Sequence, residues 1–245
     1  MANKTLIVGC SFCSTLGEQR PEQWQLHPDI IVKATSGTGN QAIAARVMYE
    51  CAQTKYDRVI VIWTGINRLD VMIPRTLHET YPGAWEGNPE YSFCTPLKSE
   101  VWYHSGGFGA SWHWDDSCPA DIKKYFKTQY LTATPQYLCD ITMSSISNTQ
   151  NFLIANNIPF DMTFIYDIHR DYRKVENGRL ENVLGRLLTD SPYYKLVDWG
   201  KLKTDNTAYE WAIQDPNRLE SDTFHPTRNA MREWINLTFG IDIAA

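Results

Sequence analysis

Five residues spread along the chain carry the groups that acyl transfer by a serine requires. Ser11 offers a hydroxyl nucleophile, and Asp222 and His225, three residues apart, offer an imidazole base with a carboxylate close by. Gly37 and Asn67 follow predicted strands, on loops where hydrogen-bond donors could face a developing oxyanion. A nucleophile, a base, a group that orients the base and oxyanion donors form the set that this chemistry needs. The question is therefore whether the fold brings the five together.

Three predicted strands would position most of this set. Leu6 to Val8 form a short apolar run that ends in a Gly-x-Ser step, which predicts a buried strand followed by a tight turn. A second strand is predicted at 29–34, before the glycine-rich loop of Gly37. The β-branched run 57–63 predicts a central parallel strand covered on both faces, and Asn67 follows it. Because the carboxyl ends of parallel strands share one edge of a sheet, the three loops should open on that edge.

The rest of the chain alternates between helical and extended patterns. This alternation predicts an α/β fold, a three-layer α/β/α arrangement with a central parallel sheet, formed by a single domain over residues 1–245. The other expected elements are a helix at 41–55, a helical region at 122–157 broken near Pro135, a strand at 160–166, a short helical stretch around 180–188, a small strand at 195–199, a loop or short helix at 204–217, and a final helix at 228–239 with Pro226 in its first turn.

Four short blocks, in this order, resemble those of the SGNH, or GDSL-like, hydrolases: Gly9-Cys10-Ser11, Ser36-Gly37, Gly65-Ile66-Asn67 and Asp222-Thr223-Phe224-His225-Pro226. The resemblance spans almost the whole chain and implies the flavodoxin-like fold of that family. It also implies an oxyanion hole made by the backbone N–H groups of Ser11 and Gly37 and by the side-chain amide of Asn67. Gly39 would replace Gly37 if the loop is registered differently.

The same resemblance implies a catalytic triad of Ser11, Asp222 and His225. In that family the serine of the first block is the nucleophile, and the last block supplies the acid and the base. One departure concerns Cys10, which stands where the family usually has an aspartate. That aspartate is not a reacting group. We therefore interpret the change as one that affects the surroundings of the nucleophile and not the reacting groups.

Each assignment has an alternative. His225 could instead cap the last helix, and Asn67 could have no role beyond stabilising its turn. Asp167-x-His169 follows the strand predicted at 160–166, so His169 could bind substrate or replace the expected acid and base pair.

Residues 75–120 have no counterpart in the four blocks and are rich in aromatics, proline and glycine. We expect an ordered insertion beside the loop edge of the sheet. It could be a self-stabilising apolar cluster, a lid, a wall on which sugar rings stack, or a surface where a second copy of the chain binds to form a homo-oligomer.

Composition excludes some classes of function. The formal net charge of −5 leaves no general basic field for nucleic acid or an anionic membrane. No apolar run approaches a membrane span, and the N-terminal apolar run is too short for a signal peptide, so we expect a cytoplasmic protein or one released without a cleaved signal.

The six cysteines are too few for a disulfide scaffold in a chain of this length. We expect reduced thiols. Cys10 and Cys13 have the spacing of half a zinc site or of a redox pair, but no second Cys-x-x-Cys occurs. We therefore expect neither a metal nor an organic cofactor, and an accessible Cys13 beside Ser11 could be reactive.

Together, these patterns predict a serine ester hydrolase whose substrate is a small molecule or glycan bearing an acyl ester, with a carbohydrate O-acetyl ester favoured. Two alternatives remain open at this point. One is a catalytically weak or inactive glycan-binding module on the same fold, and the other is an O-acyltransferase.

Overall fold

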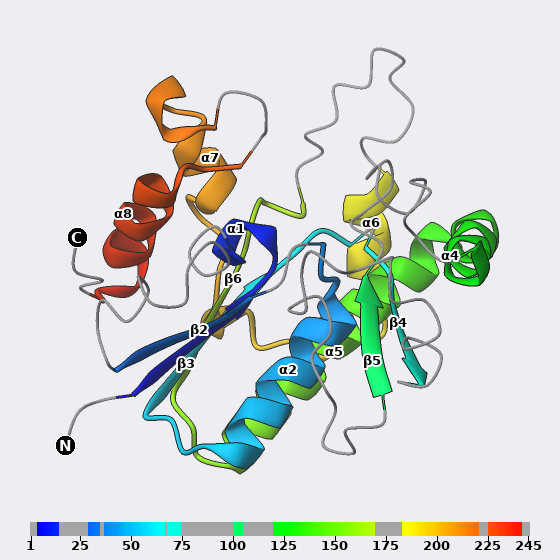
Figure 1. The fold of residues 1–245 in the computed structure, drawn as a ribbon, viewed down its shortest axis with the longest axis horizontal. Helices are drawn as coiled ribbons and strands as arrows, with labels where there is room; N and C mark the ends of the chain where they lie inside the picture. Colours follow the sequence, from blue (N-terminus) through cyan, green and yellow to red (C-terminus); the bar gives the residue numbers. More distant parts are fainter. Residues whose placement is uncertain are drawn as a thin grey trace.

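A parallel sheet of five strands lies at the centre of the computed structural model (Figure 1). The structure describes residues 4–14, 29–34, 37–66, 68–74, 100–104, 120–169, 183–220 and 225–241. The strand order is β2-β1-β3-β6-β7, which is the flavodoxin-like doubly wound order. The strands are β1 (Thr5–Gly9), β2 (Ile30–Ala34), β3 (Arg58–Trp63), β6 (Phe160–Phe164) and β7 (Leu202–Lys203).

The two central strands come from the most continuous apolar runs of the sequence. β1 and β3 pair in parallel, with Ile7 opposite Ile60, and both strands are buried on both faces. A strand that is covered on both sides needs apolar residues at every position rather than at alternate ones. This requirement explains why the runs at the start of the chain and at 57–63 predicted these strands correctly.

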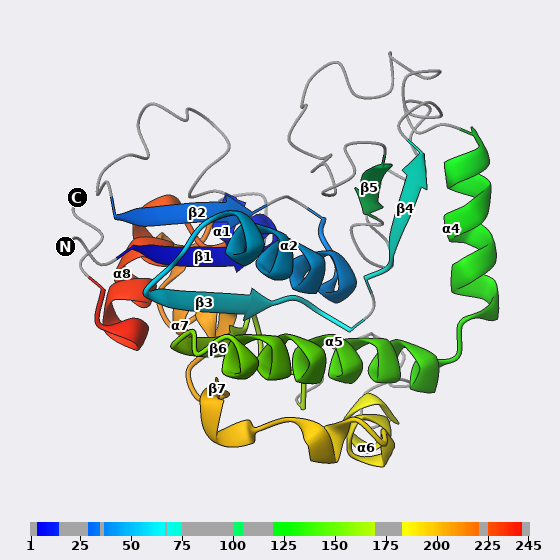
Figure 2. The same cartoon turned by 90° about the horizontal axis from the view of Figure 1, so that it is seen from below.

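Helices cover both faces of the sheet. α2 (Asn40–Gln53) and α5 (Pro135–Ala155) pack side by side on one face, while α7 (Ala208–Ala212) and α8 (Arg228–Phe239) lie on the other, as Figures 1 and 2 show. α6 (Val183–Asp190) packs against α5. The predicted α/β fold with three layers and a central parallel sheet is confirmed.

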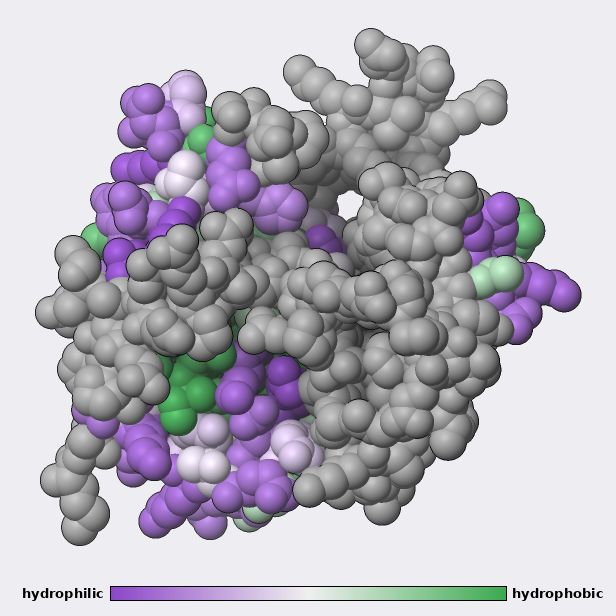
Figure 3. Space-filling view, viewed as in Figure 1, coloured by the Kyte–Doolittle hydropathy of each residue, from purple (hydrophilic) through white to green (hydrophobic). Residues whose placement is uncertain are grey.

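The final helix shows how the outer layer is held to the sheet. α8 buries residues at spacings of one, three and four, so a single face enters the core, and Trp234 at its middle is fully buried. Where this layer reaches the surface, Figure 3 shows mostly hydrophilic residues over α7 and α8. α8 ends at Gly240, whose left-handed backbone (φ 63°) suits a glycine after a helix.

Proline and threonine mark where two helices begin. α4 (Ala120–Thr132) ends before Thr134, whose hydroxyl accepts a hydrogen bond from the N–H of Tyr137 at 3.1 Å, and Pro135 is the first residue of α5. The predicted break near Pro135 is confirmed, because proline suits the first turn of a new helix and not the interior of an old one. Pro226 was expected in the first turn of α8, but it precedes the N-cap and pairs with Leu219 in an isolated β-bridge.

The strand predicted at 195–199 is wrong. Two 3-10 turns (Tyr194–Leu196 and Trp199–Lys201) occupy this stretch, and the fifth strand is the shorter β7 that follows them. The carboxylate of Asp198 accepts a hydrogen bond from the N–H of Gly200 at 3.0 Å, which closes the second turn. The indole N–H of Trp199 donates to the carbonyl oxygen of Tyr194 at 3.0 Å. The rings of Tyr194 and Trp199 pack on one another, with 4.5 Å between their centroids.

Part of the predicted insertion forms a second, small sheet. β4 (Asp70–Pro74) and β5 (Glu100–His104) pair antiparallel, with Asp70 opposite His104. Residues 75–99 and 105–119 lie outside the described residues, and with them most of the aromatics on which a lid, a sugar-binding wall or a dimer surface would depend. Within the described ranges, the structure has no helix long and apolar enough to cross a membrane.

Candidate functional site

Ser11 lies at the point where the sheet changes its winding direction. It is the first residue of α1 (Ser11–Ser14), two residues beyond the end of β1. From β1 the chain passes to β2 on one side, and it later returns to β3 on the other side of β1. Ligands of open α/β sheets bind at this switch point, outside the carboxyl ends of the strands. The backbone position of Ser11 therefore agrees with the expected position of a nucleophile.

His225 lies against the same short helix, although 214 residues of sequence separate it from Ser11. Its half-buried ring faces the ring of Phe12, with 5.1 Å between the ring centroids and a tilt of 51°. Phe12 directly follows Ser11 in α1. The structure thus brings the first and last predicted blocks together at the carboxyl edge of the sheet.

Backbone hydrogen bonds hold the segment before α8. The N–H of Glu220 donates to the carbonyl oxygen of His225 at 3.0 Å, and the N–H of Thr227 donates to the carbonyl oxygen of Arg218 at 2.7 Å. These bonds pair the residues just before 221 with those just after 224, so the backbone position of His225 is set by this pairing and not by α8 alone. Asp222 lies outside the described residues.

The structure does not support the alternative in which His225 caps the last helix. Thr227 is the N-cap of α8, and its hydroxyl accepts a hydrogen bond from the N–H of Ala230 at 3.3 Å. A threonine in this position satisfies a backbone donor that the helix itself leaves unpaired. The imidazole of His225 is therefore not needed to cap α8.

The two candidate glycines have different structural reasons to be glycine. Gly37 has a φ of 77°, in the left-handed region that side chains other than glycine rarely adopt. Gly39 has an ordinary φ of −92°, but a Cβ there would lie 2.6 Å from Oδ2 of Asp70. The N–H of Gly39 already donates to Oδ1 of Asp70 at 2.8 Å. The N–H of Gly39 therefore serves the attachment to Asp70.

Asn67 lies outside the described residues, but the segments on either side of it are anchored. Asn40 bonds to both backbone groups of Thr64, and Asp70 bonds to the start of α2. Arg68 donates to the carbonyl oxygen of Thr38 at 3.4 Å. The sequence analysis assigned no role to Asn40 or to Asp70, because a single polar residue in a loop, or a single acid before an apolar stretch, carries no signal of a distant partner.

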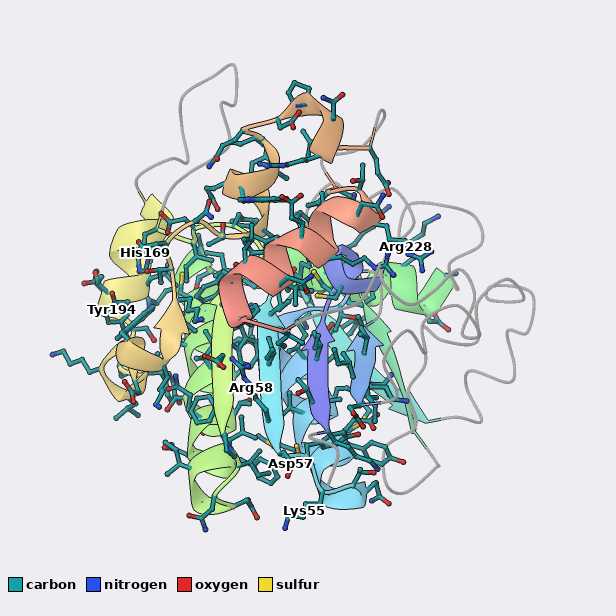
Figure 4. All side chains as sticks on the ribbon, turned by 90° about the vertical axis from the view of Figure 1, so that its left-hand side faces the viewer. Lys55, Asp57, Arg58, His169, Tyr194 and Arg228 are labelled. Atoms are coloured by element: carbon teal, nitrogen blue, oxygen red, sulfur yellow. The ribbon has the colours of Figure 1, made fainter. Side chains whose placement is uncertain are left out.

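His169, the alternative base, belongs to a different cluster. Its Nδ1 is 3.4 Å from Oδ1 of Asp167, its Nε2 is 3.5 Å from the hydroxyl of Tyr194, and its ring centroid is 5.4 Å from that of Trp199. In Figure 4, His169 and Tyr194 lie at one side of the sheet, while Arg228, three residues after His225, lies at the other side. His169 follows β6, and β3 separates β6 from the β1 strand that leads to Ser11. The structure therefore places His225, and not His169, against the helix that begins with Ser11.

The structure does not support a reactive Cys13. Cys10 and Cys13 are both fully buried, and burial, followed by the neighbouring Cys10 thiol, raises the pKa of Cys13 well above its ordinary value. Cys10, Cys13, Cys51 and Cys139 are free thiols. In the described part of the chain, no group of three or more histidine, cysteine or acidic side chains is arranged to hold a metal ion.

We expect Cys13 to resist alkylation in the folded protein. Only the thiolate attacks iodoacetamide, and both burial and the raised pKa keep this thiol protonated and covered at pH 8. Peptide mapping after a brief native treatment should find Cys13 unmodified, and the same treatment in guanidinium should modify it fully. Rapid native alkylation of Cys13, while Cys139 stays unmodified, would contradict the buried position.

Comparisons with known proteins were made by sequence and by structure. No family model matches the sequence, and no curated protein matches it either. The structure of a GDSL-like lipase from Bacteroides thetaiotaomicron aligns over 99% of this chain and 88% of its own, with a TM-score of 0.50 and 10% identity. The psychrotrophic esterase EstA from Pseudoalteromonas sp. aligns over 98% and 100%, with a TM-score of 0.46 and 14% identity. The strand order and the first of these likenesses together show that the chain has the fold of the SGNH, or GDSL-like, hydrolases.

Proposed function

We propose that the protein is a serine esterase that hydrolyses an acyl ester through a triad of Ser11, His225 and Asp222. The observation that carries this proposal is the contact between His225 and Phe12, which brings the last block of the chain to the helix that begins with Ser11. This contact lies at the switch point of the sheet, where open α/β folds bind their ligands.

The mechanism has two steps. The imidazole of His225 takes the proton of the Ser11 hydroxyl while the oxygen attacks the ester carbonyl, and Asp222 holds the imidazole in the tautomer that can accept this proton. The N–H groups of Ser11 and Gly37 and the side-chain amide of Asn67 stabilise the oxyanion. The protonated His225 then gives its proton to the leaving alcohol, and water attacks the acyl-enzyme in the second step with His225 again as base.

We propose a carbohydrate O-acetyl ester as the substrate. The aromatic-rich insertion at 75–120 directly follows β4, and the first residue of β4, Asp70, bonds to the glycine loop. In sequence, the insertion starts eight residues after Asn67. Flat aromatic side chains pack well on sugar rings, and this property of the insertion supports a sugar as the alcohol part.

Intact-mass analysis after treatment with a fluorophosphonate tests the proposal. A single adduct that maps to Ser11, and that is missing in Ser11→Ala and His225→Ala, is the expected result, because only an activated serine reacts rapidly with this reagent. A screen of acetylated sugars against the active protein then identifies the substrate. A folded protein that forms no adduct would overturn the esterase proposal and favour a glycan-binding module.

Asn67→Ala should lower kcat by roughly 100- to 1,000-fold, the usual loss when one oxyanion donor is removed. KM should change little, because the lost hydrogen bond forms mainly in the transition state. The measurement is steady-state hydrolysis of an acetyl ester, with Asn156→Ala as the matched control, since the Asn156 amide only donates to the carbonyl oxygen of Phe152 at the end of α5. If Asn67→Ala changed the thermal stability but left kcat intact, Asn67 would be a turn residue instead.

A further inference from the structure

Two segments that carry proposed oxyanion donors are joined by side-chain hydrogen bonds. One segment runs from Gly37 to Ala42, and the other from Thr64 to Asp70. The carboxylate of Asp70 accepts two backbone N–H groups of the first segment, from Gly39 at 2.8 Å and from Ala42 at 3.0 Å. Asp70 is only 7% exposed. A buried carboxylate with two charge-assisted bonds to backbone makes a strong and directional attachment.

Asp70 supplies a cap to the start of α2 that the neighbouring residues do not supply. The N-cap of α2 is Gly39, which has no side chain to accept a hydrogen bond from the first turn. Asp70 supplies that acceptor from 28 residues further along the chain, at the positive end of a 14-residue helix. The end of α2 nearest the glycine loop is therefore attached to the segment that contains Asn67.

Asn40 makes the second attachment. Its Oδ1 accepts the N–H of Thr64 at 2.9 Å, and its Nδ2 donates to the carbonyl oxygen of Thr64 and to the hydroxyl of Thr142, both at 3.2 Å. The side chain is 2% exposed. Asn40 thereby holds both backbone groups of the residue that follows β3, and it connects them to α5.

The positions of these attachments relative to the proposed donors suggest their purpose. Gly37 is two residues before Gly39, and Asn67 lies midway between Thr64 and Asp70, three residues from each. We propose that Asp70 and Asn40, together called the loop brace, are positioning residues that set the distance between the Gly37 N–H and the Asn67 amide. This inference rests on the proposed function, since it assigns a role only if these two groups stabilise an oxyanion.

At Gly39 the two segments joined by the loop brace leave no room for a side chain. A Cβ at this position would lie 2.6 Å from Oδ2 of Asp70 and 3.0 Å from the carbonyl oxygen of Arg68. The two segments thus approach one another closely enough to require a glycine. Oxyanion donors contribute most when they are held in place before the reaction begins, so a rigid connection between their loops should increase the rate.

Asp70→Asn is the test variant. An amide at this position can accept one of the two N–H groups, but its NH2 group would face the other as a second donor. We expect kcat for an acetyl ester to fall by on the order of 10- to 100-fold, because small displacements of catalytic groups are costly. KM should stay within about threefold of the wild-type value, since ground-state binding does not depend on the donors. Asp198→Asn is the matched control, because Asp198 also accepts a backbone N–H, at the distant Gly200.

Two further readouts separate positioning from stability. Hydrogen exchange of the peptide that covers residues 37–43 should become faster in Asp70→Asn and stay unchanged in Asp198→Asn. In the Asn67→Ala background, Asp70→Asn should cost less in kcat than it does in the wild type, because one of the groups that it positions is already missing. A residue that only stabilises the fold would lower activity equally in both backgrounds.

Each outcome decides the inference. Faster local exchange, a lower kcat and non-additive losses would support the loop brace as a positioning device. An unchanged kcat in Asp70→Asn, or losses that simply add, would overturn it while leaving the esterase proposal intact. If the wild type itself forms no phosphonate adduct at Ser11 and hydrolyses no ester, the proposed function fails and the inference fails with it. Asn40→Ala provides the second variant if Asp70→Asn does not fold, with the same expectations.

Discussion

Ser11→Ala should abolish ester hydrolysis, with kcat falling by roughly 10⁶-fold, as for other serine nucleophiles that act together with a base. The methyl side chain cannot form an acyl-enzyme, so only the oxyanion donors and substrate binding would remain to assist attack by water. The measurement is single-turnover and steady-state hydrolysis of an acetyl ester at neutral pH. Circular dichroism should show the same fold, because the backbone at this position belongs to the first turn of α1.

Ser144→Ala is a suitable control for the nucleophile. The hydroxyl of Ser144 donates to the carbonyl oxygen of Ile141 within α5, and nothing in the mechanism involves it. This variant should retain wild-type turnover. If Ser11→Ala kept more than about one hundredth of the activity, far above what loss of a nucleophile allows, Ser11 would be a helix-terminal residue and the hydrolysis would have another nucleophile.

His225→Ala should have an effect of similar size, about 10⁶-fold in kcat, because a nucleophile and its base act as one unit. In the intact protein, kcat/KM should fall on acidification, because a protonated His225 can no longer accept the proton of Ser11. A pH profile measured from pH 5 to 8 with the wild type reads this directly. A flat profile over that range would rule out His225 as the base.

His169→Ala distinguishes the two candidate histidines. In the structure, the ring of His169 contacts Tyr194 and Trp199 and does not belong to the cluster around α1. We therefore expect His169→Ala to cost less than about tenfold in turnover, far below the loss of a base. If His169→Ala were inactive and His225→Ala active, the pair of Asp167 and His169 would be the acid and base instead.

Most of the fold could be predicted because its central elements depend on local patterns. The apolar runs of β1 and β3 are long enough, and continuous enough, to indicate strands buried on both faces. α8 was predicted with its full extent, Arg228–Phe239, since its apolar residues repeat at helical spacing and Gly240 ends it. The break before α5 followed from Pro135 alone.

The wrong predictions concern stretches where contacts within a turn override the pattern. Residues 195–199 contain enough apolar residues for a strand, but Asp198 closes a turn and Trp199 bonds to Tyr194. Cys13 would be reactive only if it were accessible, yet it points into the core from the short helix that begins with Ser11. Residues on one turn of a helix face different directions, so nearness in sequence did not predict exposure.

Residue types and their spacing along the chain were enough to identify the candidate groups and their order: Ser11, Gly37, Asn67, then Asp222 and His225. The strands could also be predicted, because an apolar run is a pattern within one short segment of the chain. The folded structure was needed to show that His225, and not His169, contacts α1, and that Asp70 and Asn40 connect the segments that follow β2 and β3. These contacts join residues from distant parts of the chain, and no local pattern encodes them, because they exist only once the sheet has brought the carboxyl ends of its strands to one edge.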